Sequence, residues 1–509
     1  GDPLTAKPVS WTYRLLKRAK KNRLATGIGI GAAVITLILI SSFVWVQWQN
    51  KRQAEYAREF SDEIKNIQSV LPNIYTAPLH DVRPELAALK SRLKKMEQRM
   101  KEGGSAAQDP GNNALGQGYL ALGEIEKARI HLEKAWQSGY HTPSTAYALG
   151  QTMGLLFQKK LAEVERNPSE EIRKKLKQEY EKDYRDPAVQ YLKQSQGSVE
   201  SPAYVEGLIA LYEKRYDDAL KKAKETYAKS NWSYEAKVLE GKALAGKAQK
   251  KFDAGDYKGT IQEYDLAGKS FVEASELGRS RGDIYLSDCE RWGDTLEAQT
   301  YTNISPALSL QKSEEACNKA ILVNPDEPAA YLRKAYVYNR LARYLLYSTS
   351  DDPRALLKKA INSANQAKQK DPKSWEPPHM LLTAGLLAGE YELRHGLNPQ
   401  NTLNEAINQG DTALKLSPNN AGVMHNIGVT LALLGEYENQ NGKNPIPTYQ
   451  KAIDLYKKVE QIDRTISTGN EKGISYWFIA SYQKDHGEDP TESYQRAAES
   501  YEQFLKETP

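Results

Sequence analysis

DDPRALLKKAI at residues 351–361 is followed by three stretches of the same design: LNPQNTLNEAI (397–407), KNPIPTYQKAI (443–453) and EDPTESYQRAA (488–498). Their prolines are spaced at intervals of 46, 46 and 45 residues: Pro353, Pro399, Pro445 and Pro490. A period this regular indicates stacked supersecondary units and not independent domains. Each stretch also predicts a helix start, because proline is tolerated in the first helical turn and the preceding Asn or Asp can cap the helix.

A small residue recurs seven positions after each of these prolines, at Ala360, Ala406, Ala452 and Ala497, where it would let two helices pack closely. Earlier in the chain, LGQGYLALGEIEKARIHLEKAW (115–136) resembles the tetratricopeptide repeat through Gly116, Tyr119 and Ala128. EGLIALYEKRYDDAL (206–220) resembles it through Gly207 and Ala219. The resemblance implies an all-α chain in which residues 105–509 form a tetratricopeptide-like α-solenoid, a right-handed superhelix of helix pairs.

Residues 24–46, LATGIGIGAAVITLILISSFVWV, contain no charge over 23 positions. A helix of this length spans roughly 34 Å, which is enough to cross a bilayer core of about 30 Å. The alternating Gly27, Gly29 and Gly31 would suit a phosphate-binding loop only between a strand and a helix with polar access. We therefore predict a transmembrane helix, in which these glycines and Ala33 either pack against a second helix or are simply the glycines common in membrane spans.

Basic residues precede the predicted span. Residues 1–23 carry a net charge of +6, and the other 486 residues carry about −1. By the positive-inside rule, residues 1–23 form a cytoplasmic juxtamembrane segment and everything after the span lies outside the cytoplasm. A repeat body without a basic excess argues against nucleic acid as a partner.

Residues 47–104 predict a helical stalk or hairpin. A polar helix would run to Pro72, and a second would start at Pro84 and end at Gly103-Gly104. The stretch GGSAAQDPGNN (103–113) predicts a loop before the repeats.

A second resemblance concerns the whole layout. GDPLTAKPVSWTYRLLKRAKKNR (1–23) is similar to the segment that follows the catalytic domain in bacterial eukaryotic-like serine/threonine protein kinases, one group of which carries a single span and a tetratricopeptide ectodomain. APLHDVRPELAALKSRL (77–93) is also similar to that group. The resemblance implies the sensor region of a kinase-type receptor in a bacterial inner membrane, with the repeats in the periplasm. The kinase motifs themselves, a glycine-rich loop, His-Arg-Asp and Asp-Phe-Gly, are not in this sequence.

Residues for chemistry are scarce. We assign no catalytic, cofactor-binding or metal-binding residue, and we expect that the chain is not an enzyme. Cys289 and Cys317 fall at helix-packing positions, where two buried free thiols are favoured over a disulfide, although a disulfide stays possible outside the cytoplasm.

First helices line the concave face of such a solenoid, which binds peptides or protein segments. Six polar residues of predicted first helices are candidates for that groove: Asn113, Gln117, Arg333, Tyr338, His425 and Asn426. The leading hypothesis is a receptor region that signals through its span, with a homodimer through the transmembrane helix as one arrangement. The alternative is a non-catalytic scaffold subunit of a larger envelope membrane complex.

Overall fold

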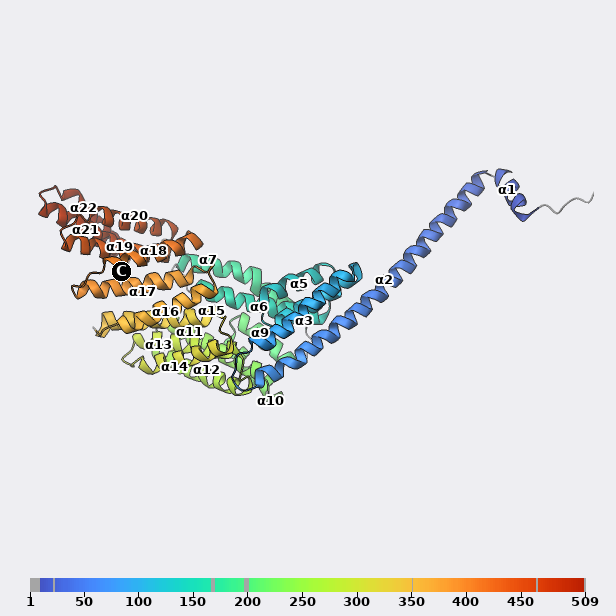
Figure 1. Ribbon diagram of the computed structural model, residues 1–509, viewed down its shortest axis with the longest axis horizontal. Coiled ribbons are helices and arrows are strands. Elements are labelled where there is room, and N and C mark those ends of the chain that lie inside the picture. Colours follow the sequence, from blue (N-terminus) through green and yellow to red (C-terminus); the bar gives the residue numbers. More distant parts are fainter. Residues whose placement is uncertain are drawn as a thin grey trace, which may run out of the picture.

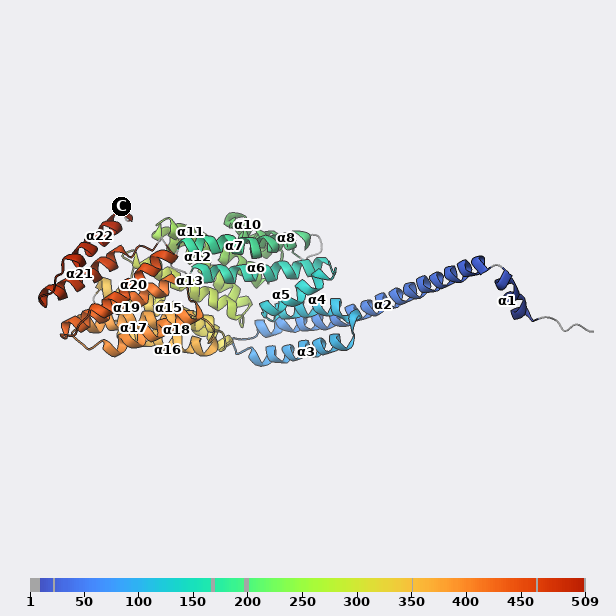
Figure 2. The same cartoon turned by 90° about the horizontal axis from the view of Figure 1, so that it is seen from above.

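The computed structural model describes residues 10–21, 23–165, 170–195, 201–349, 351–463 and 466–507. Residues 1–9 of the predicted cytoplasmic segment lie outside these ranges. Within them, every regular element is a helix, which confirms the predicted all-α class. A short helix, α1 (Trp11–Lys21), precedes one very long helix, α2 (Arg23–Thr76), which leads away from a body of packed helices (Figure 1; Figure 2).

Helix α2 has two halves with different surroundings. Its 54 residues give a length of about 80 Å. The N-terminal part is apolar and long enough to cross a membrane, and none of its most apolar window is buried against the rest of the chain. Leu37, for example, is 66% exposed. In an aqueous protein such a surface would be unstable, so this segment is a candidate membrane span.

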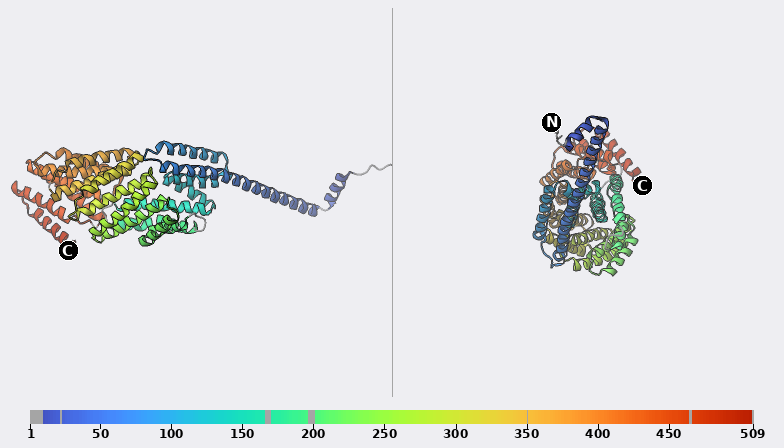
Figure 3. Two further views of the ribbon diagram at one scale, coloured as in Figure 1. Left: turned by 90° about the horizontal axis from the view of Figure 1, so that it is seen from below. Right: turned by 90° about the vertical axis from the view of Figure 1, so that its right-hand side faces the viewer.

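The C-terminal half of α2 is part of the first hydrophobic core. Phe60, Ile64, Ile67 and Leu71 recur at helical spacing on one face, and all are buried. They pack with residues of α3 (Arg83–Glu102) and α4 (Ser105–Ala121) in one continuous cluster. The segment predicted as a stalk is therefore built into the body over most of its length (Figure 3).

Two sequence-based boundaries were wrong. Helix α2 does not end at Pro72 but continues to Thr76, because burial of Leu71 and Ile74 outweighs the one backbone hydrogen bond that proline removes. The predicted loop at 103–113 is mostly helix α4. Of the residues in this stretch, only Gly104 has a positive φ, of 60°, and it separates α3 from α4. Gly111 lies so close to α3 that an added Cβ would meet Met100 Cγ at 2.5 Å, so its small size serves packing and not a turn.

The remaining helices of the described chain stack as nine pairs, each a first and a second helix packed side by side (Figure 1). Pairs α4 with α5 (Ile125–Gln137) and α6 (Pro143–Glu165) with α8 (Asp186–Ser195) come first; α7 (Glu170–Tyr180) and a short π-helix, η1 (Glu181–Arg185), lie between α6 and α8. The following pairs are α9 (Pro202–Tyr212) with α10 (Tyr216–Lys229), α11 (Tyr234–Asp253) with α12 (Tyr257–Leu277), and α13 (Gly282–Thr300) with α14 (Ala307–Val323). The last are α15 (Pro328–Tyr344, extended by η2, Leu345–Thr349) with α16 (Arg354–Lys370), α17 (Glu376–Arg394) with α18 (Gln400–Leu416), α19 (Ala421–Gln440) with α20 (Ile446–Ile462), and α21 (Gly469–Asp485) with α22 (Thr491–Glu507). This array is a tetratricopeptide-like α-solenoid.

The repeated prolines stand where the sequence predicts helix starts. In each case the side chain before the proline accepts a hydrogen bond from the backbone N–H after it, as in Asp352 with Arg354 at 2.9 Å and Asn398 with Gln400 at 3.0 Å. Asn444 with Ile446 and Asp489 with Thr491 repeat the same arrangement. The proline carbonyl then accepts the first helical hydrogen bond, as from Leu357 N to Pro353 O at 3.0 Å.

Small residues of the repeats lie between helices. Ala128, Ala219, Ala360, Ala406 and Ala452 are at most 2% exposed. An added Cβ on Gly116 or Gly207 would meet Leu132 Cγ at 2.4 Å or Leu239 Cδ2 at 2.7 Å. Tyr119 is 7% exposed beside them. Larger side chains at these sites would push the paired helices apart.

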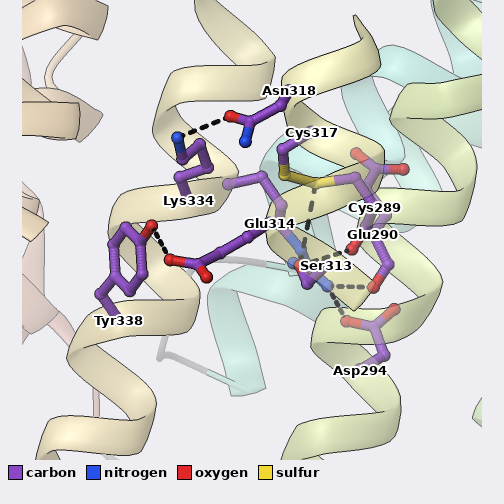
Figure 4. Close-up of a disulfide and its surroundings, with 10 residues drawn as sticks. Cys289, Glu290, Asp294, Ser313, Glu314, Cys317, Asn318, Lys334 and Tyr338 are labelled. Carbon is purple, nitrogen blue, oxygen red and sulfur yellow. Dashed lines mark hydrogen bonds and ion pairs between the residues drawn. A yellow bond between two sulfur atoms is a disulfide. The ribbon is translucent and has the colours of Figure 1, made fainter. Parts of the chain in front are cut away.

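Cys289 of α13 and Cys317 of α14 form a disulfide, so the sequence-based preference for two free thiols was wrong (Figure 4). Both residues are fully buried, as predicted. The pair meets because Ser313 keeps α13 and α14 close: its hydroxyl donates to Cys289 O at 3.2 Å, and the two cysteine Cα atoms are 5.1 Å apart. A two-helix geometry of this kind cannot be read from a spacing of 28 residues.

The connection between α2 and α3 is fixed to the middle of the body. Tyr75 O accepts a hydrogen bond from Ser280 N at 2.9 Å, and Val82 N donates to Val323 O at 3.1 Å. His80 N donates to Ser280 Oγ at 3.2 Å. Residues 75–83 thus join the first core to α13 and α14, more than 200 positions later in the sequence.

Candidate functional site

The first helices form the inner side of the solenoid. First helices of successive pairs contact one another, α13 with α15, α15 with α17, and α17 with α19. In a curved stack the elements that approach each other most closely lie on the concave side. The concave face is therefore the surface on which a binding site is expected.

One pocket on this face combines aromatic and charged side chains. It has a volume of about 230 Å³ and lies among α6, α9, α10, α11, α12 and α13. Its aromatic wall consists of Phe157, Tyr212, Tyr216, Tyr264 and Phe271. Its polar wall consists of Gln158, Lys214, Lys242, Ser287, Glu290, Arg291 and Asp294.

Glycines make room for the arginines around this pocket. An added Cβ on Gly268 of α12 would lie 2.8 Å from Arg291 Cζ, and one on Gly293 of α13 would lie 2.9 Å from Arg333 Nε. On α11, Gly241 admits the ring of Phe271 in the same way, at 2.6 Å. Because these three glycines have no side chain, the side chains of Phe271, Arg291 and Arg333 can lie directly against the helices that carry them.

The buried cations of the pocket are held by specific acceptors. Arg291, only 4% exposed, donates from Nε to Asp288 Oδ1 at 2.8 Å and from a terminal nitrogen to Tyr264 O at 3.3 Å. Arg333 donates to Glu290 O at 2.7 Å and pairs with Asp294. Both guanidiniums are engaged by protein acceptors, although Arg333 Nε is buried without a hydrogen-bond partner, and both shape the wall.

Lys242 is the cation least compensated by charge. Its Nζ donates to the neutral Gln158 Oε1 at 2.8 Å. Burial lowers the pKa of Lys242, and the acidic Asp283 and Glu290 only partly oppose this effect. A buried ammonium without a carboxylate in contact gains from an incoming acceptor, so Lys242 is the best placed group to bind a carbonyl or carboxylate of a ligand.

The guanidinium of Arg281 links this region to α2. Arg281 donates from Nε and a terminal nitrogen to the two oxygens of Asp283 at 2.8 and 2.7 Å. Its guanidinium also lies 4.6 Å from the ring centre of Tyr75, on α2, and 5.2 Å from that of Tyr234, on α11. Burial alone would raise the pKa of Asp283, but the charge of Arg281 outweighs it and lowers that pKa.

The six groove candidates from the sequence do not lie together. Arg333 borders the pocket through Asp294. Asn113 and Gln117 are hydrogen-bonded to each other at 3.0 Å on α4, where Asn113 also accepts from Thr145 of α6 at 2.9 Å. Tyr338 is 3% exposed and donates to Glu314 of α14, so it faces the second helices (Figure 4).

The other two candidates lie further along the array, on α19. Asn426 donates to His379 of α17 at 3.0 Å, and His425 lies 3.5 Å from Glu471 of α21. These side chains connect neighbouring first helices. Their binding roles, like those of Asn113 and Gln117, stay predictions.

Sequence reasoning missed the aromatic and charged set around Lys242. The available signal was the series Gly241, Gly268 and Gly293, since glycine inside a helix needs a packing reason. Among the described residues, no group of three or more His, Cys, Asp or Glu side chains is arranged to hold a metal ion.

Comparison with known proteins finds no matching family model and no matching curated protein. Among solved structures, a monomeric mutant of IFIT1 with m7Gppp-AAAA is 15% identical, with a TM-score of 0.35, and the match covers 73% of this chain and 76% of that one. Human IFIT1 dimer with PPP-AAAA is 12% identical (TM-score 0.31; 81% and 94% covered). Yeast Tom70 is 14% identical (TM-score 0.29; 82% and 92% covered). Similarity of this size concerns helical architecture and carries nothing about function.

Proposed function

We propose that this chain is a membrane-anchored receptor region whose concave pocket binds a peptide or protein segment outside the cytoplasm. The observation that carries the proposal is the pocket around Lys242, where an undercompensated ammonium, two carboxylates and five aromatic rings share one concave surface. A peptide backbone presents both carbonyl and N–H groups, which match these donors and acceptors, and apolar side chains match the rings.

The outward placement of the repeats has two supports. The basic residues of the chain concentrate before the apolar part of α2, which favours a cytoplasmic N-terminus. The Cys289–Cys317 disulfide belongs to an oxidising compartment such as the periplasm.

Transmission through the membrane is supported by the continuity of α2. The helix runs without a break from the apolar segment into the first core, and its end touches Arg281. Arg281 pairs with Asp283, whose charge also acts on Lys242 in the pocket. A ligand that rearranges Lys242 or Asp283 would therefore act on the contact between Arg281 and Tyr75, and so on α2 itself.

In its finer form, the proposal makes this chain the sensor region of a bacterial kinase-type receptor in the inner membrane, as the resemblance of residues 1–23 implies. The receptor output would be a change in how two membrane helices associate. A scaffold subunit of an envelope complex would use the same surface without a signal.

The test is photo-cross-linking from inside the pocket in the full chain and its native membrane. Gln158→p-benzoylphenylalanine places the reactive group beside Lys242. The matched control is Trp232→p-benzoylphenylalanine, at a site that is 70% exposed and does not line the pocket. We expect a discrete adduct from position 158 that is absent at position 232 and is lost on adding Lys242→Met.

Mass spectrometry of the adduct separates the alternatives. A peptide or a protein present in small amounts supports the receptor, whereas a stoichiometric membrane protein supports the scaffold. Identical labelling at positions 158 and 232, or an adduct that survives Lys242→Met unchanged, would refute the pocket as the binding site.

A further inference from the structure

Helix α1 is strongly amphipathic and basic. In WTYRLLKRAKK, Trp11, Leu15 and Ala19 follow one another at i, i+4 and i+8, with Leu16 beside them. Arg14, Lys17 and Lys21 recur at i, i+3 and i+7 on the opposite side. With Arg18 and Lys20, the helix carries five basic residues and no acidic one within 11 positions.

The apolar face of α1 is covered by nothing in the described chain. Trp11 is 76% exposed, Leu16 is 64% exposed and Leu15 is 49% exposed. The helix does not continue the axis of α2 but turns away from it (Figure 1; Figure 2). Thr26 Oγ1 of α2 donates a hydrogen bond to Ala19 O of α1 at 3.4 Å, beside the turn.

The position of α1 along the chain identifies what covers that face. Helix α1 ends at Lys21, and the uncharged run of α2 begins at Leu24. If α2 crosses a bilayer, α1 therefore lies at the level of the lipid headgroups. A basic amphipathic helix at that level places its apolar side chains among the acyl chains and its basic ones among the headgroups.

We propose that α1 is an interfacial helix that binds the anionic phospholipid surface of the leaflet in which α2 begins. This inference rests on the proposed insertion of α2. Its recognition chemistry is lipid phosphate with a net negative charge, because five cations without a counter-ion on their own helix match an anionic surface and not a zwitterionic one. The apolar stripe of Trp11, Leu15 and Leu16 supplies the depth of insertion.

The test uses the full chain with Leu15→Cys, which places the only free thiol on the apolar face because both native cysteines are in the disulfide. An environment-sensitive fluorophore on this thiol is compared in vesicles of phosphatidylcholine alone and of phosphatidylcholine with about 30% phosphatidylglycerol. We expect a blue-shifted, brighter emission only in the anionic vesicles. Salt at about 1 M, where the Debye length is roughly 3 Å, should reverse it.

A triple charge variant measures how much the basic residues contribute to the binding of α1 to anionic vesicles. Arg14→Gln, Lys17→Gln and Arg18→Gln leave Lys20, Lys21 and Arg23 in place, so the orientation of the span is retained. Each basic residue near an anionic surface contributes roughly fivefold, so the ratio of bound to free α1 should fall on the order of 100-fold. The matched control is Lys94→Gln, Lys95→Gln and Lys101→Gln on exposed positions of α3, which should leave the emission unchanged.

Two outcomes overturn the inference while leaving the proposed function intact. One is a label at position 15 that stays in water in both kinds of vesicle; the other is a label that is equally shielded in neutral vesicles. A label at Ile35→Cys, in the exposed apolar part of α2, distinguishes a failure of α1 to bind the lipid surface from a failure of α2 to insert into the membrane. That label should be shielded in every vesicle, and its exposure to water would overturn both proposals.

Discussion

Arginine positions around the pocket are decided by glycines on the neighbouring helix. Gly293 is the sharpest case, because an added Cβ would lie 2.8 Å from Val337 Cγ2 and 2.9 Å from Arg333 Nε. Since Arg333 pairs with Asp294 of the pocket wall, a single methyl group at position 293 acts on both packing and charge.

Gly293→Ala is expected to destabilise the body by about 1–3 kcal/mol through overpacking, although alanine is the better helix former. The matched control is Gly282→Ala in the first turn of the same helix, where the nearest atom would be Val323 Cγ1 at 3.4 Å and the change should be neutral or slightly stabilising. Urea unfolding followed by circular dichroism measures both variants. Equal stability of the two would show that Arg333 and Val337 move away at little cost.

His379 gives the array a defined response to acid. Burial, reinforced by the charge of Arg343, lowers the pKa of His379 to about 4, and its neutral Nε2 accepts a hydrogen bond from Asn426 at 3.0 Å. The pKa in the unfolded chain is about 6.5, so the unfolded state binds the proton first. The stabilisation is present above pH 6.5 and is lost as the pH falls from about 6.5 towards 4.

Between pH 7 and pH 5 this single group should destabilise the fold by roughly 2 kcal/mol. Thermal unfolding of the native chain is compared with that of His379→Gln, whose amide oxygen keeps an acceptor for Asn426 and does not titrate. The variant should lose less stability between the two pH values. An equal loss would mean that His379 is protonated at little cost in the folded state.

The C-terminal half of α2 and helix α3 share a hydrophobic core with α4 and α5. Phe60 and Ile67 of α2 and Leu93 of α3 are at most 2% exposed in the same core as α4 and α5. A fragment that starts at residue 105 would expose the apolar faces of α4 and α5 to water, whereas one that starts near residue 50 keeps this core.

We expect the fragment 105–509 to be cleaved rapidly by protease in α4 and α5, and the fragment 50–509 to be resistant. The core residues that the shorter fragment lacks each contribute about 1.5–3 kcal/mol when buried, so the local stability of the first pair should be lost. Removing the last pair, residues 466–509, is the matched truncation and should affect only its neighbour, because a repeat array is stabilised by nearest-neighbour contacts. Equal protease resistance of the two N-terminal fragments would favour a stalk over a hairpin packed on the repeats for residues 47–104.

Periodic features were predictable from the sequence, whereas features that depend on a third element were not. The Asp352-Pro353 and Asn398-Pro399 starts are local, because the cap lies two residues from the N–H that it binds. Helix α4 was mistaken for a loop because Gly111 suggests a turn. The glycine is instead required by close packing against Met100, which lies on another helix. The pocket around Lys242 was missed for the same reason, since six helices contribute to it.

On the scale of the whole molecule, α2 is the one described element shared by the apolar segment and the repeat core. At its end, Tyr75 O accepts a hydrogen bond from Ser280 N, and along its side Phe60 and Ile67 are buried in the first core. The body therefore cannot rotate about α2 without breaking that core. If α2 spans a membrane, as we propose, changes in the body would reach that membrane as movements of α2, and the surface that α2 offers to a second copy would decide what such a movement does.

That surface contains Gly27 and Gly31 on one stripe and Gly29 and Ala33 on another. Apart from the backbone of α2 itself and the adjoining residues, no atom of the described residues lies within 4 Å of a Cβ added at any of the three glycines, so substitution there leaves the described fold of the single chain undisturbed. If Gly27 and Gly31 form a helix–helix contact, Gly31→Ile should weaken association of the full chain on the order of tenfold, or about 1.4 kcal/mol. Ala32→Ile, one position away and off both stripes, is the matched control. Energy transfer between labelled copies in vesicles measures association, with Gly29→Ile reporting on the second stripe. Loss from Gly31→Ile alone assigns the contact to the first stripe, whereas identical association of all three variants would mean that the glycines are only part of a membrane span.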